Sequence, residues 1–216
     1  MQSKTAISPA VLAEHLERLN FSLPDDALSG LSLYLGQLAK WNKSMNLVGT
    51  SSWEDTLENL VADSFHLAIF LRSLPLVANP TSFDLGAGAG LPGIPLRLVW
   101  RKGTYTLVEA REKRALFMRT VLASLALERT NVFLGRAEDF FVLSGQADCI
   151  LSRAFMPWRD LLVFIENALL PKGFAVFLTR EPIPESLPAP WRSAAQIEYM
   201  VKDVRRYFWA LTRERQ

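Results

Sequence analysis

Cysteine and histidine are scarce in this sequence of 216 residues, which contains one cysteine and two histidines. The single Cys149 cannot form an internal disulfide, and this pattern is typical of proteins in a reducing compartment. The sequence also lacks the clusters of cysteine and histidine that hold zinc. We therefore expect a cytoplasmic protein without disulfides and without a bound metal.

Long apolar runs and a strong charge excess are missing as well. No stretch of about 18 uncharged apolar residues occurs, so we expect no membrane-spanning helix. Residues 1–10 contain neither the apolar segment of a secretion signal nor a lipidation motif. The formal net charge is only +2. Such a small excess does not by itself predict nucleic-acid binding, for which a local basic patch would be needed.

The first 75 residues predict helices. Ser8 followed by Pro9 is a favourable helix start, and a second helix begins at Asp25 or Asp26. That second helix has an apolar face with spacings of three and four, made by Leu28, Leu31, Leu35, Leu38 and Trp41. Ser51 and Glu54 match a capping box and predict the start of a third helix. We expect an N-terminal helical region over residues 1–75.

From residue 81 onward, short apolar runs alternate with helix patterns. The predicted strands are 82–85, 105–109, 131–134, 147–151 and 174–178, and the predicted helices lie at about 91–100, 113–126, 138 and 158–169. This alternation indicates an α/β domain with a parallel sheet and helices on both faces. Two last strands, 197–201 and 207–212, predict a closing antiparallel hairpin. We expect residues 76–216 to form this Rossmann-like domain with seven strands.

A glycine-rich stretch follows the first predicted strand directly. Four glycines, Gly86, Gly88, Gly90 and Gly93, fall within eight residues after Asp84. Glycine at this density allows a tight turn, with no Cβ to keep a ligand away from the backbone. The following helix start offers unpaired N–H groups and the positive end of a dipole. The stretch therefore predicts a loop that binds a nucleotide-like ligand.

Two cofactors compete for this loop. Gly88, Gly90 and Gly93 spell the dinucleotide fingerprint, which alone is a weak signal. That fingerprint places its first glycine directly at the strand end, whereas here Asp84 and Gly86 already occupy that point. The order of an acid followed by alternating glycines resembles motif I of the Rossmann-like methyltransferases that use S-adenosylmethionine (AdoMet). The closing hairpin is also typical of these enzymes, so we expect AdoMet rather than NAD.

Two acids end the first two strands, at the edge where ligands of open parallel sheets bind. Asp84 can accept a hydrogen bond from the cofactor's amino group through the loop or water, or it can stabilise the turn through loop N–H groups. Glu109 can accept from both ribose hydroxyls of the cofactor, or it can pair with Arg111 or Lys113.

The third and fourth strands also end in candidate residues. The backbone at Ala137 and the side chain of Glu138 can read the adenine edge, or Glu138 can simply favour a helix start through the dipole. Arg153 follows an apolar strand and needs an anionic or carbonyl partner there. That partner is a cofactor carboxylate, an RNA phosphate or an internal carboxylate of Asp84, Glu109 or Glu138.

Five segments together carry a specific family resemblance, and they occur in the order Met45-Asn46-Leu47, Asp63-Ser64, Asp84 to Pro95, Gly135 to Glu138 and Ser152 to Phe155. In this the chain resembles the RsmG family, also called GidB, of bacterial small-subunit rRNA guanine-N7 methyltransferases. The resemblance covers roughly residues 43–178. It implies that AdoMet is contacted by Gly86, Leu91, Ala137, Glu138 and Arg153.

The chain departs from the family at several basic positions. Asn59 and Leu60 stand where the family usually has Arg-His, and Thr179 precedes Arg180 where the family has lysine. The family also has an Arg-His pair at the start of its last strand, where this chain has Arg205-Arg206. The support for the cofactor is therefore stronger than the support for the family's substrate. Basic side chains that can contact rRNA phosphates are Arg111, Lys113, Arg114, Arg119, Arg136, Arg205 and Arg206.

These observations predict an AdoMet-dependent methyltransferase that acts on N7 of a guanine in 16S rRNA, as a monomer acting on the small ribosomal subunit. N7 has a free lone pair, so alignment of the reactants suffices and no general base is required. Arg153 is the best candidate for a residue that acts on the reaction. Two alternatives remain open, namely an AdoMet methyltransferase with another target and a non-catalytic module that binds AdoMet or RNA.

Overall fold

The computed structural model describes residues 7–213. Residues 1–6 and 214–216 lie outside the described residues. They belong to the predicted segments 1–75 and 76–216, and residues 1–6 are most of the stretch that was searched for a secretion signal. The strands are β1 (Thr81–Leu85), β2 (Thr104–Glu109), β3 (Thr130–Leu134), β4 (Ala147–Arg153), β5 (Leu169–Thr179), β6 (Trp191–Val201) and β7 (Val204–Arg213). The helices are α1 (Pro9–Arg18), α2 (Asp25–Met45), α3 (Trp53–Thr56), the π-helical turn η1 (Leu57–Val61), α4 (Ala62–Ser73), α5 (Gly93–Val99), α6 (Glu112–Ser124), α7 (Ala137–Ser144) and α8 (Trp158–Ile165).

The strands form one sheet of seven in the order β3-β2-β1-β4-β5-β7-β6. The pairs among β1 to β5 are parallel, whereas β7 pairs antiparallel with β5 and with β6. This confirms the predicted mostly parallel sheet with a closing antiparallel hairpin. The strand order reverses between β1 and β4, and ligands of such sheets bind beyond the carboxyl ends of the strands at this point.

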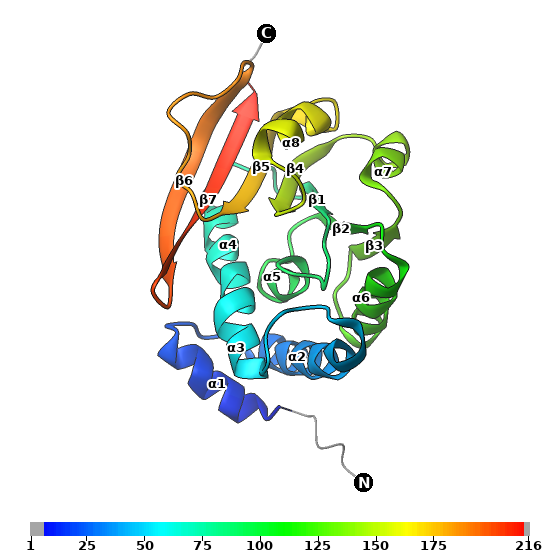
Figure 1. The fold of residues 1–216 in the computed structure, drawn as a ribbon, viewed down its shortest axis with the longest axis vertical. Coiled ribbons are helices and arrows are strands. Elements are labelled where there is room, and N and C mark those ends of the chain that lie inside the picture. Colours follow the sequence, from blue (N-terminus) through cyan, green and yellow to red (C-terminus); the bar gives the residue numbers. More distant parts are fainter. Residues whose placement is uncertain (1–6, 214–216) are drawn as a thin grey trace.

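Helices cover both faces of the sheet (Figure 1). One hydrophobic cluster joins the sheet to α1, α2, α4, α5 and α6, and a second cluster joins the other face to α7 and α8. Within residues 7–213, no helix is long and apolar enough to cross a membrane. The three layers are those predicted from the alternation of strand and helix patterns.

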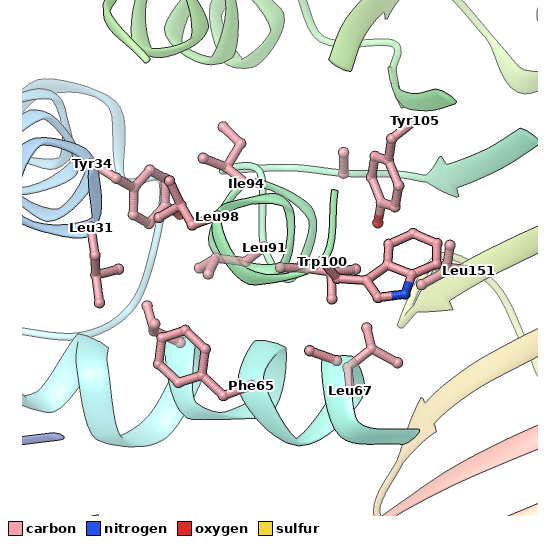
Figure 2. Close-up of a cluster of buried hydrophobic side chains, with 14 of the residues drawn as sticks. Leu31, Tyr34, Phe65, Leu67, Leu91, Ile94, Leu98, Trp100, Tyr105 and Leu151 are labelled. Atoms are coloured by element: carbon pink, nitrogen blue, oxygen red, sulfur yellow. The ribbon is translucent and has the colours of Figure 1, made fainter. Parts of the chain in front are cut away.

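The N-terminal helices share their core with the sheet (Figure 2). Side chains of α2 and α4, such as Leu31 and Phe65, belong to the same buried cluster as Leu98 of α5 and Leu151 of β4. Helix α5 therefore lies between the N-terminal helices and the sheet. A boundary between two domains near residue 75 stays a prediction, since one continuous core spans it.

The segment between α2 and α4 differs in detail from the sequence-based prediction. Ser52 caps α3, because its hydroxyl accepts a hydrogen bond from the backbone N–H of Asp55 at 3.1 Å. The capping box predicted at Ser51 is therefore wrong by one residue. After one turn the helix widens into the π-turn η1 before it continues as α4. Such turns are rare in proteins, and those that occur often lie at functional sites.

A carboxylic acid is buried in this core at the end of β1. The side chain of Asp84 is 1% exposed, and the hydroxyl of Tyr105 donates a hydrogen bond to it at 3.1 Å. Desolvation by burial raises the pKa of Asp84 to about 7, although the bond from Tyr105 partly opposes the shift. The acid is therefore protonated more readily in the folded protein than in the unfolded chain, where the pKa is about 3.9.

This shift makes the stability of the protein depend on pH. Between about pH 4 and pH 7 the folded state holds one proton more than the unfolded state at Asp84, so the free energy of unfolding falls as the pH rises. The slope from this group is at most about 1.4 kcal/mol per pH unit. In Asp84→Asn this contribution is lost, and urea denaturation at a series of pH values should show a flatter profile. Parallel profiles for the two proteins would contradict the assignment.

Candidate functional site

The glycine-rich loop leaves β1 through a tight turn. The backbone N–H groups of Gly86 and Ala87 both donate to the carbonyl of Val108, at 2.9 and 3.1 Å. Gly86 has a φ of +68°, and a Cβ at this position would lie 2.7 Å from the ring of Phe155. A side chain at position 86 would therefore be strained and would also collide. Gly88 and Gly90 have positive φ angles as well.

The N-terminal helical region contacts the loop from the side of the hydrophobic core. The hydroxyl of Tyr34, in α2, donates a hydrogen bond to the carbonyl of Ala89 at 2.9 Å. Tyr34 is fully buried, and desolvation raises the pKa of its hydroxyl far above the ordinary value. The hydroxyl therefore stays protonated and remains a donor, so α2 anchors the loop at Ala89.

Glu109 joins the end of β2 to this loop. Its Oε2 accepts from the backbone N–H of Gly88 at 2.9 Å, and its Oε1 accepts from the N–H of Arg111 at 2.8 Å. No described Arg or Lys side chain forms an ion pair with Glu109. The alternative of a side-chain pair with Arg111 or Lys113 is therefore not what the structure shows. Each carboxylate oxygen keeps a second lone pair for a ligand.

The residues predicted at the end of β3 lie beside β2. The N–H of Gly135 donates to the carbonyl of Glu109 at 3.1 Å. Ala137 is buried at the first position of α7, whereas Glu138 is exposed and pairs with Arg136 at 3.0 Å. The backbone around Ala137 is thus close to Glu109, and the Glu138 carboxylate already has a cationic neighbour.

Asp84 and Leu91, which flank the loop, are both buried. A Cβ at Gly93 would lie 2.6 Å from Oδ2 of Asp84, so this carboxyl group packs against the start of α5. Leu91 is also buried, in the cluster around α5 (Figure 2). The structure therefore brings Gly86, Gly88 and the buried Glu109 together at the edge of the sheet, next to the buried Asp84.

A cleft of about 630 Å³ opens at the ends of β4 and β5. It is bounded by η1 and α4, by the turn after β4, and by the β6–β7 hairpin. The residues that line it are Asn59, Leu60, Asp63, Ser152, Arg153, Ala154, Met156, Trp158, Phe177, Leu178, Thr179, Arg180, Tyr199, Val204, Arg206 and Trp209. Phe155, which packs on Gly86, stands in the chain between the cleft residues Ala154 and Met156, so the turn after β4 lies between the cleft and the glycine-rich loop.

A buried carboxylate, Asp63, organises one wall of the cleft. Nη1 of Arg206 donates to its two oxygens at 2.7 and 2.6 Å, and the hydroxyl of Tyr199 donates to Oδ1 at 2.8 Å. Nη2 of Arg153 lies 3.6 Å from Oδ2. Arg153 therefore does have an internal carboxylate partner, but this is Asp63 and not Asp84, Glu109 or Glu138.

The sequence signal for Asp63 was its place in an Asp-Ser segment of the family resemblance, which predicted no role for it. Its partner Arg206 was predicted to contact RNA, yet its side chain is only 11% exposed and its guanidinium bonds Asp63. Arg205, next to it, pairs with Glu198 at 3.0 Å on the exposed side of the hairpin.

The charges that line the cleft are three arginines and one aspartate. Arg180 lies exposed at the rim and forms no ion pair with any described residue. Neither histidine of the chain lines the cleft. The cleft therefore has a positive balance that suits a phosphate-bearing ligand, and it contains no histidine to act as a base.

Comparisons with known proteins agree with this geometry. A family model described as rRNA small subunit methyltransferase G matches residues 27–186. Ribosomal RNA small subunit methyltransferase G of Nitratidesulfovibrio vulgaris (strain DP4) is 50% identical over 211 residues, which cover 98% of this chain and 97% of that protein. The protein of the same name from Lawsonia intracellularis (strain PHE/MN1-00) is 46% identical over 202 residues, or 93% of each chain.

A solved structure shows that the fold is shared more widely. A mutant of MtNAS in complex with S-adenosylmethionine has a TM-score of 0.60 and 16% identity, and the match covers 97% of this chain and 85% of that one. The predicted Rossmann-like methyltransferase fold and the predicted family are thereby confirmed. This chain belongs to the rRNA small subunit methyltransferase G family and is a methyltransferase of small-subunit rRNA.

Proposed function

We propose that this chain methylates N7 of a guanine in 16S rRNA within the small ribosomal subunit, acting as a cytoplasmic monomer without a metal. The observation that carries the proposal is the cleft beside the glycine-rich loop, which offers no free general base. Its one carboxylate, Asp63, is already bonded to Arg206 and Tyr199. A target whose nitrogen is unprotonated at neutral pH needs no base, and guanine N7 is such a target.

The residues of the loop fit AdoMet. A Cβ at Gly86 or Gly90 would collide with Phe155 or Ile94, so these glycines let the loop pack on the protein, whereas Gly88 has no other atom closer than 3.7 Å to a Cβ and leaves the backbone open to a ligand. We assign Glu109 to the ribose hydroxyls, since both of its oxygens keep a lone pair after accepting from the backbone. AdoMet, when bound, supplies a methyl group on a positively charged sulfur.

We assign the adenine and methionine ends of AdoMet to two other parts of the same sheet edge. We assign the adenine to the backbone at Ala137 and to Glu138, next to Glu109. Asp84 acts from below, by holding the start of α5 and thereby the loop, together with Leu91. Arg153 lies between the loop and the cleft, where its guanidinium can bind the carboxylate of the cofactor or a phosphate of the target.

Catalysis in this proposal is a matter of alignment. The loop and Glu109 fix the cofactor, and the walls of the cleft fix a base that has left its stack, so that the attacking nitrogen and the methyl group face one another. Arg153 is a positioning residue, because it lines the cleft beside Asp63, and the residue before it, Ser152, pairs with Leu85 at the start of the loop.

The direct test is transfer of tritiated methyl groups from AdoMet to small ribosomal subunits that lack the N7 modification. We expect label in one guanine of 16S rRNA, and a loss of at least about tenfold in kcat/KM for Arg153→Met, because a charge-assisted contact is removed. Arg192→Met, an exposed arginine of β6 that does not line the cleft, is the matched control and should keep the rate. Cofactor binding without any transfer would favour a non-catalytic module or another target.

A second prediction concerns the support of the loop by α2. In Tyr34→Phe the carbonyl of Ala89 loses its buried donor, and we expect the Kd for AdoMet to rise about fivefold or more. Isothermal calorimetry measures this directly. Ser32→Ala serves as the control, since the hydroxyl of Ser32 lies in the same helix but bonds the carbonyl of Ile7. An unchanged Kd in Tyr34→Phe would show that α2 does not support the loop.

A further inference from the structure

We propose that Asn59 reads the donor edge of the target guanine and so distinguishes guanine from adenine. The inference rests on the proposed function of the cleft. Asn59 lies in the π-turn η1 and lines the cleft opposite the glycine-rich loop. The family resemblance implies no role for Asn59, since the family usually has an arginine at this position.

The backbone at Asn59 is fixed by the same network that organises the cleft. Nη1 of Arg206 donates to the carbonyl oxygen of Asn59 at 2.8 Å as well as to Asp63. In a π-turn the backbone hydrogen bonds join residues five apart, whereas in an α-helix they join residues four apart. Here the carbonyl of Asn59 accepts a hydrogen bond from the guanidinium of Arg206. The position of Asn59 is therefore tied to β7 and does not depend on the helix alone.

The orientation of the Asn59 side chain follows from its neighbours. Its Nδ2 donates to the backbone carbonyl of Asp55 at 3.1 Å, and it also donates to the carboxylate of Asp55. Both groups of Asp55 can only accept, so the amide nitrogen must face them. The amide oxygen is then left as an acceptor, and no described residue donates to it. The side chain thus offers the cleft an acceptor of fixed identity.

Guanine presents complementary groups on the edge that lies opposite N7. Its N1–H and its 2-amino group are donors, whereas N1 of adenine is an acceptor. In the sheet, the loop after β1 and the hairpin strand β7 lie on opposite sides of β4 and β5. A guanine whose N7 faces the loop therefore turns its donor edge toward Asn59, which Arg206 ties to β7. An adenine in the same pose would set two acceptors against each other.

The remaining walls of the cleft suit a flat base. Trp158 lines it with one face covered by the guanidinium of Arg159, 4.1 Å from the ring centroid. The ring of Trp209 meets Trp158 edge-on at 6.0 Å. The indole of Trp158 is held in one plane by these contacts, and stacking of a base on an aromatic ring is typical of proteins that bind unpaired nucleotides.

The test uses reconstituted small subunits that carry guanine, inosine or 2-aminopurine at the target position. Inosine lacks the 2-amino group and 2-aminopurine lacks N1–H, while both retain N7. We expect Asn59→Ala to lower kcat/KM for guanine by about tenfold to a hundredfold, because a buried donor loses its acceptor. If Asn59 contacts the 2-amino group, the wild-type protein is already slow with inosine, and Asn59→Ala changes that rate little. If it contacts N1–H, the same holds for 2-aminopurine.

A purely structural role of Asn59 would give a different pattern. In that case Asn59→Ala would slow all three bases equally, and this result would overturn the proposal, as would an unchanged rate with guanine. AdoMet binding and the thermal midpoint are measured alongside, and Asn131→Ala, an exposed residue of β3, is the matched control. If the wild-type protein labels no guanine at all, the proposed function fails and the role of Asn59 fails with it.

Discussion

The arrangement of the site depends on one buried carboxylate. Asp63 bonds Arg206 and Tyr199 of the hairpin and lies 3.6 Å from Arg153 of β4. A buried charge without a partner is costly, so the folded protein must keep these groups together. The network thereby fixes α4, the β6–β7 hairpin and the end of β4 relative to one another, and the space left between them is the cleft. The cleft is in this sense a consequence of neutralising Asp63.

The N-terminal helices serve both halves of the site. Tyr34 of α2 holds the glycine-rich loop through the carbonyl of Ala89, and Asp63 of α4 with Asn59 of η1 forms a wall of the cleft. These helices also share their hydrophobic core with the sheet. They therefore contribute residues both to the support of the glycine-rich loop and to the lining of the cleft.

Local patterns in the sequence predicted much of this fold. The glycine-rich loop, the alternation of strands and helices and the closing hairpin depend on neighbouring residues, and all three are found. The contacts that build the cleft could not be predicted in this way, since Asp63 and Arg206 lie 143 residues apart in the chain. The buried position of Asp84 also escaped prediction, because a strand end alone does not show whether its side chain faces the core or the ligand edge.

In the proposed function the glycine-rich loop and the cleft are two ends of one site. A crystal structure with S-adenosylhomocysteine and 7-methylguanosine 5′-monophosphate would test it most directly. We predict the ribose of the first ligand at Glu109, and the base of the second in the cleft with N7 toward the loop and its opposite edge toward Asn59. A guanine base bound outside the cleft, or bound with N7 turned toward the hairpin, would contradict this account.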